Sequence, residues 1–182
     1  MRIVGGRHGG RTLAAPKSQA IRPTADRLRE SLFNILVHAY GNPVADARVI
    51  DLFAGTGALG LEALSRGARS ADFVEFRPAS LHALRANVAA LRVREKTRIF
   101  KRDAVQFAAG LDADVYDIAF VDPPYESRQL DLVLRSWQER RFARVLVAEH
   151  ARAHQLPPGS VRLTFEDTLI TVYRSLTPES AT

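Results

Sequence analysis

The sequence predicts an α/β fold built on a mostly parallel, seven-stranded sheet, and three observations support this prediction. Apolar residues alternate along the chain between the two-residue period of strands and the 3.6-residue period of helices. Helical segments are expected in three of the four connections between the first five strand-like segments, as parallel neighbours require. The last two strand-like segments, 161–165 and 169–174, are too close together for a helix between them, so they predict an antiparallel hairpin.

The same apolar patterns predict where each strand and helix lies along the chain. Strands are expected at 49–53, 71–75, 97–101, 115–121 and 143–149, and helices at 24–39, 57–66, 78–91 and 129–139. Pro78 suits the first turn of its helix, where a missing N–H costs little. The hairpin then adds one antiparallel strand at the end of the sheet.

A length of 182 residues is close to that of one ordinary domain. We expect an N-terminal basic extension at 1–20, a main domain at 21–175 and a tail at 176–182. The glycine-rich start of the extension predicts a small β-hairpin that projects from the domain.

The positive charge of the chain lies mainly in two blocks. Residues 1–30 carry seven basic and two acidic side chains, and residues 77–102 carry eight basic side chains and one acidic. Such blocks favour a polyanionic partner, because neutralising phosphates releases counterions. Ordinary solvated surface is the alternative, above all for the second block.

Several function classes are disfavoured. The chain has no cysteine, which excludes disulfides and thiolate metal sites. It contains no apolar run of about 18 residues that would span a membrane and no secretory signal, so we expect a cytoplasmic protein. His150 and His154 have metal-ligand spacing for a helix, but the nearby Leu156-Pro157-Pro158-Gly159 makes a helix and a metal site unexpected.

A glycine-rich loop, Gly55-Thr56-Gly57-Ala58-Leu59-Gly60, follows the first expected strand and opens a helix. Glycines at such a place let the backbone turn tightly and approach a ligand closely. Glu75 ends the next strand, where a carboxylate can accept hydrogen bonds from both ribose hydroxyls. Together these features predict an adenosine-containing cofactor, either NAD or S-adenosylmethionine.

Asp51 favours S-adenosylmethionine. It lies within an apolar strand, where a carboxylate is costly without a partner. The ammonium of a methionine moiety would be such a partner, and neighbouring backbone N–H groups are the alternative. Asp103 and Ala104 follow the third strand where the adenine is expected, and a carboxylate there can accept from the adenine amino group.

The sequence Asp122-Pro123-Pro124-Tyr125 directly follows the fourth strand, at the same sheet edge as the glycine loop. Two prolines fix the backbone, so the Asp122 carboxylate and the carbonyl that follows are held as two acceptors. Acceptors on both hydrogens of an exocyclic base amine would aim its lone pair at a sulfonium methyl. Tyr125 offers an aromatic face for a base withdrawn from its stack.

The order of these residues resembles that of class I S-adenosylmethionine-dependent methyltransferases, which have a Rossmann-like fold. More narrowly, the chain is similar to the bacterial 16S rRNA guanine-N(2) methyltransferases of the RsmD family. The similarity is carried by Arg2-Ile3-Val4-Gly5-Gly6, by the run from Arg22 to Asn34, by the segment from Phe53 to Ala68, and by Val121 to Tyr125.

The resemblance implies that S-adenosylmethionine is the methyl donor and that a guanine of 16S rRNA is the acceptor, within an assembled or assembling small ribosomal subunit. It implies a substrate-holding role for the N-terminal segment, where Arg2, Arg7 and Arg11 can bind phosphates. The expected catalytic residues are Asp122, Pro123, Pro124 and Tyr125. The expected cofactor-binding residues are Asp51, Phe53, Ala54, Gly55, Thr56, Gly57, Gly60, Glu75, Asp103, Ala104, Arg22 and Thr24.

Other expectations complete this interpretation. Arg27 and Arg29 are expected on the exposed face of the first helix, and the protein is expected to be a monomer without a metal. The rival functions are methylation of adenine in DNA or of a protein amine, an NAD-dependent oxidoreductase, and a non-catalytic RNA-binding module.

Overall fold

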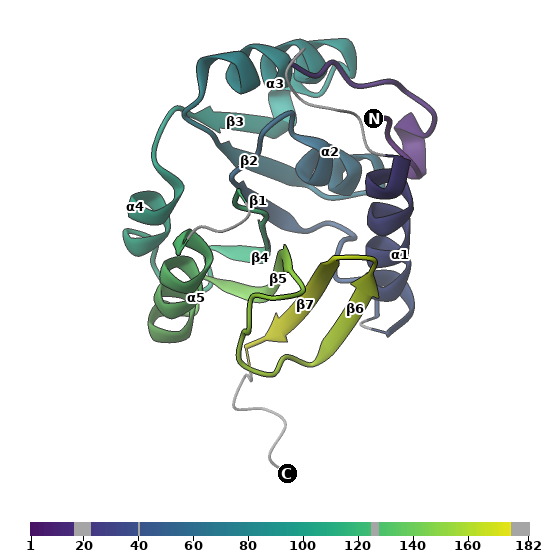
Figure 1. The fold of residues 1–182 in the computed structure, drawn as a ribbon. Coiled ribbons are helices and arrows are strands. Elements are labelled where there is room, and N and C mark those ends of the chain that lie inside the picture. Colours follow the sequence, from purple (N-terminus) through teal and green to yellow (C-terminus); the bar gives the residue numbers. More distant parts are fainter. Residues whose placement is uncertain (17–22, 40, 125–127, 176–182) are drawn as a thin grey trace.

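The computed structural model describes residues 1–16, 23–39, 41–124 and 128–175, which form one seven-stranded sheet with helices on both faces (Figure 1). The strand order is β3-β2-β1-β4-β5-β7-β6, and β7 alone runs antiparallel to its neighbours. The strands are β1 (Arg48–Leu52), β2 (Ser70–Val74), β3 (Thr97–Phe100), β4 (Tyr116–Val121), β5 (Ala143–Ala151), β6 (Val161–Phe165) and β7 (Thr168–Arg174). The predicted mostly parallel sheet with one antiparallel strand is therefore confirmed.

Two layers of helices cover the sheet. The helices are α1 (Pro23–Ala39), α2 (Ala58–Ser65), α3 (Pro78–Ala90), α4 (Ala104–Ala109) and α5 (Gln129–Arg140), with short 3-10 helices η1 (Gly6–His8) and η2 (Arg94–Lys96). α4 was not expected, because six residues are too few to show a helical period in the sequence. None of the helices in the described part of the chain is long and apolar enough to cross a membrane.

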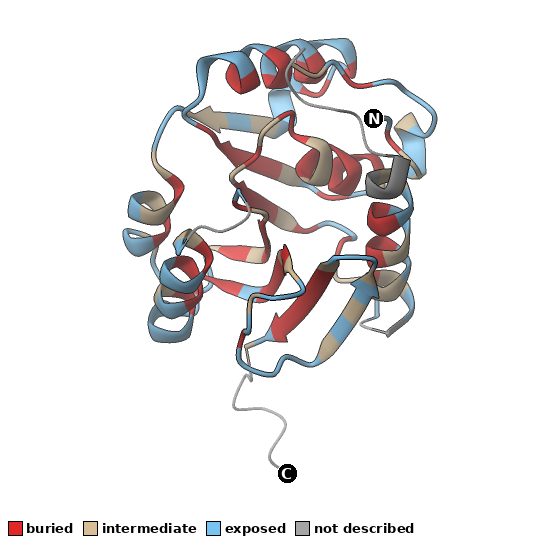
Figure 2. Cartoon of the chain, viewed as in Figure 1, coloured by how far each residue is buried: buried red, intermediate tan, exposed pale blue. Residues whose placement is uncertain are grey.

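Neighbouring residues of the central strands point into opposite layers of the core. On β1, Val49 packs with the cluster that includes α1, α2 and α3, whereas Ile50 packs with the cluster that includes α4 and α5. Both are fully buried, and Figure 2 shows the central strands as the buried part of the molecule. This two-sided burial explains why the parallel strands read as continuous apolar runs.

The N-terminal segment, residues 1–16, does not project as predicted. It carries one isolated β-bridge, between Arg2 and Thr12, and its Ile3 and Leu13 are buried in the core beside α1 and α2. Backbone N–H groups of Val4 and Gly5 donate to the Glu62 carboxylate of α2, at 2.7 and 2.8 Å. The segment is therefore held along the domain surface rather than extended into solvent.

A buried charge cluster fixes this segment to α1 and α2. Glu62 is fully buried, and its carboxylate lies 2.8 Å from Arg66 Nε and 3.5 Å from Arg29 Nε. Arg29, which was expected to be exposed, is buried and also binds Asp26 at 2.7 Å. The expectation failed because residues 1–5 cover that face of α1, whereas Arg27 is exposed as expected.

Both ends of the N-terminal segment return to the glycine loop. Met1 Sδ lies 3.3 Å from Thr56 Oγ1. The Asn87 side chain accepts from the Ala14 N–H at 2.7 Å and donates to the carbonyls of Ala14 and Thr56, at 3.0 and 2.9 Å. The segment and the loop therefore form one hydrogen-bonded unit.

We predict that Glu62→Gln destabilises the protein by about 3 kcal/mol, because Arg29 and Arg66 lose the charge that compensates them in a buried environment. Urea unfolding measures this loss, and hydrogen exchange at the Val4 and Gly5 amides should accelerate in parallel. The exposed Glu139→Gln serves as the matched control and should change the unfolding free energy by less than about 0.5 kcal/mol. Equal stability of the two variants would contradict the role given to Glu62.

Candidate active site

The strands β1, β2, β3 and β4 are parallel, so the loops that follow them meet at one edge of the sheet, here named the carboxyl edge. Ligands of open α/β sheets bind at this edge. The described residues that the sequence assigned to the cofactor and to catalysis follow these four strands, with three exceptions. Asp51 lies within β1, Gly60 lies in α2, and Thr24 lies in α1. Topology alone therefore brings together residues more than 70 positions apart in the chain.

Asp51 is buried on the central strand β1. Its Oδ2 accepts a 3.0 Å hydrogen bond from the Gly60 N–H in the first turn of α2. Burial raises the pKa of Asp51, the hydrogen bond from Gly60 lowers it, and the nearby carboxylates of Asp122 and Glu75 raise it, with a net pKa of about 8. A carboxylate in this position gains most from a positively charged ligand, because such a ligand stabilises its ionised form.

The glycine loop is a close-packed turn. A Cβ at Gly57 would lie 2.4 Å from the Leu84 side chain, and a Cβ at Gly60 would lie 2.4 Å from the Phe73 ring. Glycine at both places therefore lets α2 approach the sheet and α3 closely. Phe53 adopts a left-handed backbone conformation (φ 67°), which is strained for an aromatic residue and places the chain turn directly after β1.

Glu75 is held rigidly after β2. One carboxylate oxygen accepts from the Gly55 N–H at 2.9 Å, and the other accepts from the N–H groups of Phe76 and Arg77, at 2.9 and 2.8 Å. Burial raises the pKa of Glu75, but the hydrogen bonds and charge of Arg77 lower it more, so the net pKa lies below its usual value. The carboxylate is thus ionised and oriented, as a ribose-binding group should be.

A pocket opens beside Glu75 at the carboxyl edge. Its lining residues come from all four loops: Phe53, Val74, Glu75, Phe76, Arg77, Arg102, Ala104, Pro124 and Gln129. Phe76 is 52% exposed, although most large apolar side chains of the protein are buried. The sequence interpretation missed Phe76. The available signal was an aromatic residue directly after the acidic end of the second strand.

The Asp122-Pro123-Pro124 turn closes the other side of this edge. Asp122 is half-buried and Pro123 is buried, whereas Pro124 is exposed. Burial raises the pKa of Asp122, while the Arg77 guanidinium opposes the shift. Tyr125 lies outside the described residues.

The remaining predicted cofactor residues differ in what the structure shows. Asp103 caps α4, since its Oδ1 accepts from the Gln106 N–H at 2.9 Å, and Ala104 lines the pocket. Arg22 lies outside the described residues. Thr24 falls in the first turn of α1, and its side chain is also outside them.

The three predicted phosphate-binding arginines do not form one group, because Arg2 lies outside the pocket that Arg7 and Arg11 line. Arg2 is exposed and has an ion pair with Asp26 at 3.5 Å. Arg7 and Arg11 instead line a different pocket, with residues 90–96. These residues precede β3, so that pocket lies at the amino edge of the sheet, opposite the carboxyl edge.

His150 and His154 do not share a metal-like arrangement. His150 Nε2 is 2.9 Å from Thr171 Oγ1 on β7, and His154 Nε2 is 2.9 Å from Asp131 on α5. Within the described ranges, no three His, Asp or Glu side chains are grouped to hold a metal ion.

The residues at the carboxyl edge fit S-adenosylmethionine. Asp51 is a buried carboxylate with one hydrogen bond to the backbone, and an ammonium group would complete its environment. Glu75 presents a fixed, ionised carboxylate to the pocket, and Phe76 presents an exposed ring beside it. Asp51 therefore matches the ammonium of the cofactor, Glu75 matches the ribose and Phe76 matches the adenine, while the glycine loop leaves room for the ligand to approach the backbone.

Comparisons with known proteins give the family. A family model described as "Conserved hypothetical protein 95" matches residues 1–165. An Escherichia coli K12 protein named ribosomal RNA small subunit methyltransferase D is 42% identical over 131 residues, which cover 72% of this chain and 63% of that protein. The chain belongs to the RsmD-like family of class I methyltransferases.

Solved structures agree with this membership. The yhhF protein from E. coli superposes with a TM-score of 0.81 at 31% identity, covering 96% of this chain and 97% of that one. The T. thermophilus 16S rRNA N2 G1207 methyltransferase (RsmC), solved with AdoMet and guanosine, shares the fold with a TM-score of 0.68 at 20% identity, covering 88% and 45%. The methyl donor of the RsmD-like family is S-adenosylmethionine, in agreement with the prediction from the glycine loop, Glu75 and Asp51.

We predict that Asp51→Asn weakens S-adenosylmethionine binding by about 10- to 100-fold, the usual worth of one charge-assisted hydrogen bond. Isothermal titration calorimetry measures this loss. The unfolding free energy of the cofactor-free protein, in contrast, should not be lowered by Asp51→Asn. Because the folded-state pKa of Asp51 is raised to about 8, the folded protein holds a proton that the unfolded chain loses above about pH 4, so stability falls as pH rises between these values.

The asparagine has no such proton, and the unfolding free energy of the variant should therefore equal or exceed that of the wild type at pH 8. Asp112→Asn, at an exposed position, is the control and should change neither quantity. A variant that binds the cofactor normally would contradict the role of Asp51.

We also predict that Phe76→Ala weakens S-adenosylmethionine binding by at least about fivefold, because stacking of a base on an aromatic ring contributes about 1–3 kcal/mol. The ring is half-exposed, so thermal unfolding of the cofactor-free variant should stay close to that of the wild type. The control is Leu132→Ala, because Leu132 is the other exposed large apolar side chain in the described part of the chain. If both variants bind the cofactor equally well, Phe76 has no part in the site.

Proposed function

We propose that this protein transfers a methyl group from S-adenosylmethionine to the exocyclic N2 amine of a guanine in 16S rRNA. The observation that carries the proposal is the Asp122-Pro123-Pro124 turn, which follows β4 beside the strand that bears Asp51. The name of the 42% identical E. coli relative supports ribosomal RNA as the substrate class. The basic character of the chain, with a net charge of +6, suits a polyanionic substrate.

At the carboxyl edge, three acidic side chains and one aromatic ring would each have a separate role. Asp51 binds the ammonium of the cofactor, Glu75 accepts from the ribose hydroxyls, and Phe76 packs against the adenine. S-adenosylmethionine supplies a methyl group on a positively charged sulfur. Asp122 would then be left to the substrate amine, since it directly follows the adjacent strand β4 and is half-buried.

Asp122 would act by orientation. Its ionised carboxylate accepts one hydrogen of the guanine amine, and the Pro123 carbonyl accepts the other, so that the nitrogen lone pair is directed away from the ring. The N–C bond forms as the S–C bond breaks, and the bonding electron pair stays on sulfur. The amine proton becomes acidic as the new bond forms and passes to Asp122 or to water. Positioning of this kind accounts for a large part of many enzymatic rate gains.

The substrate is expected to be an assembled or assembling small ribosomal subunit rather than free RNA. A domain of 20.1 kDa has little surface with which to read a base sequence. RNA shape or bound ribosomal proteins would therefore supply part of the recognition. We propose that the protein acts as a monomer in the cytoplasm and needs no metal.

Methyl transfer from labelled S-adenosylmethionine to unmodified small ribosomal subunits tests the proposal, with the RNA digested to nucleosides and separated by chromatography. We expect label in N(2)-methylguanosine, and a loss of at least about 100-fold in Asp122→Asn, within the usual range for removal of one acid-base or orienting group. Asp112→Asn, exposed and remote from the turn in sequence, is the matched control.

The pH dependence gives a second readout. Only ionised Asp122 can accept from the amine, and burial raises its pKa, so kcat/KM should fall on the acid side at a higher pH than for an ordinary aspartate. Label in a nucleoside other than N(2)-methylguanosine, or in protein, would overturn the guanine assignment. Full activity of Asp122→Asn would overturn the catalytic assignment.

A further inference from the structure

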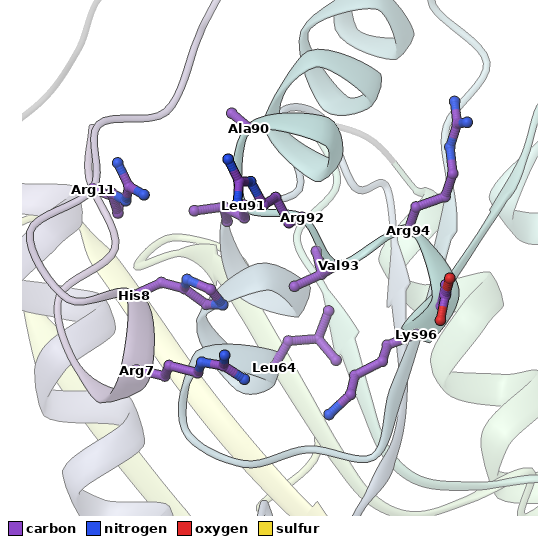
Figure 3. Close-up of a pocket in the computed structure, with 11 residues that line it drawn as sticks. Arg7, His8, Arg11, Leu64, Ala90, Leu91, Arg92, Val93, Arg94 and Lys96 are labelled. Atoms are coloured by element: carbon purple, nitrogen blue, oxygen red, sulfur yellow. The ribbon is translucent and has the colours of Figure 1, made fainter.

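A second pocket, of about 690 Å³, lies at the amino edge of the sheet. One wall is the N-terminal segment with Arg7, His8 and Arg11, and the other is the connection from α3 to β3 with Arg92, Arg94 and Lys96. Figure 3 shows Arg7 and His8 pointing from one wall toward the space that Lys96 enters from the other. We name this pocket, formed by these six side chains, the basic cleft.

The cations of the basic cleft form no ion pairs with the described residues of the protein. Among the described residues, none of Arg7, Arg11, Arg92, Arg94 and Lys96 has a carboxylate within ion-pairing distance, and all five are exposed. Other members of the second basic block do have partners, since Arg98 pairs with Asp72 and Arg77 with Glu75. Among the described residues, the block thus contains paired and unpaired cations, and three of the unpaired ones, Arg92, Arg94 and Lys96, line this cleft.

The electrostatic environment of the cleft is strongly positive. Glu95 is the single carboxylate among its lining residues. Burial lowers the pKa of His8, and the neighbouring charges of Arg7 and Arg11 lower it further. The same positive charges that disfavour protonation of His8 would be stabilised by an anion placed between them.

The walls of the cleft are held in place. The His8 N–H donates to Ser65 Oγ at the end of α2 at 2.8 Å, while Val4 and Gly5 are bound to the buried Glu62. On the opposite side, Leu91 and Val93 are buried in the core. The charges are therefore carried by anchored backbone rather than by a free terminus.

The cleft cannot belong to the cofactor site. It adjoins the start of β3, whereas the cofactor residues follow the strand ends, and a five-residue strand alone separates these edges by about 16 Å. Its large apolar lining side chains, Leu64, Leu91 and Val93, are buried, and only the small side chain of Ala90 is exposed, so the described lining offers little apolar surface to a protein partner. Six basic side chains around a wide opening suit the spaced phosphates of a nucleic acid better than a single small anion.

We propose that the basic cleft binds phosphates of the rRNA several nucleotides from the methylated guanine. The inference rests on the proposed rRNA substrate and adds a second contact region, remote from the reaction. Phosphate contacts of this kind fix the register of the protein on its substrate without reading bases.

The test compares Arg92→Gln/Lys96→Gln with the control Arg135→Gln/Arg140→Gln, which removes the same charge from exposed positions of α5. Binding of each protein to an unmodified 16S rRNA transcript is measured by filter binding over a range of salt concentrations. We expect the cleft variant to bind at least about fivefold more weakly at physiological salt, with the slope of log K against log salt reduced by about two. The control should keep the wild-type slope, and both variants should bind S-adenosylmethionine normally.

Equal affinity and slope in the two variants would overturn the inference. If the cleft variant binds assembled subunits more weakly but protects the same 16S rRNA phosphates from hydroxyl-radical cleavage as the wild type, the cleft contacts a ribosomal protein and the RNA assignment is wrong. Filter binding does not depend on methyl transfer. If the wild type labels no guanine while the cleft variant still loses affinity for the transcript, the proposed reaction fails and the cleft inference stands.

Discussion

The hydrogen bond between the Gly60 N–H and the Asp51 carboxylate, 3.0 Å long, joins the central strand to the helix that follows it. It requires a buried carboxylate in the sheet and a helix start without a side chain, since a Cβ at Gly60 would overlap the Phe73 ring. Once α2 lies there, the glycine loop must turn tightly, and Gly55 meets the Glu75 carboxylate of the next strand at 2.9 Å. The cofactor site thus follows from one packing constraint. The same constraint has a cost, because burial and the nearby carboxylates of Asp122 and Glu75 raise the pKa of Asp51, and a cationic ligand would relieve it.

The N-terminal segment depends on the same helix. Glu62 lies one turn or less after Gly60, on the face of α2 that the segment covers, and binds it through two backbone N–H groups. Asn87 connects the segment to the carbonyl of Thr56 within the glycine loop. A displacement of Met1 or Ala14 would therefore strain contacts with Thr56 of the glycine loop, which physically connects the segment to the candidate cofactor site.

Much of the fold could be predicted because its signals are local. Apolar runs mark β1 and β4, and the two-residue link before β7 excludes a crossover. The site at the carboxyl edge followed from topology, because Asp51, Glu75 and Asp122 each stand at or near the end of a parallel strand. Tertiary contacts caused the failures. Arg29 has an ordinary surface spacing on α1, and only the covering segment buries it against Glu62. Phe76 carries no periodic signal, and its exposure is a property of the folded edge.

The basic residues show most clearly where sequence reasoning ends. A block of eight cations in 77–102 looks uniform, yet the fold assigns Arg77 and Arg102 to the cofactor pocket, Arg98 to a buried aspartate, and Arg92, Arg94 and Lys96 to the opposite edge. Separation of this kind has a chemical reason. At the carboxyl edge the charge of Arg77 is paired with Glu75, whereas Arg92, Arg94 and Lys96 at the amino edge have no ion pair with the described residues and attract phosphates away from the candidate cofactor site. A small methyltransferase that must bind both a cationic cofactor and a polyanion is therefore served by placing the two charges at opposite ends of one sheet.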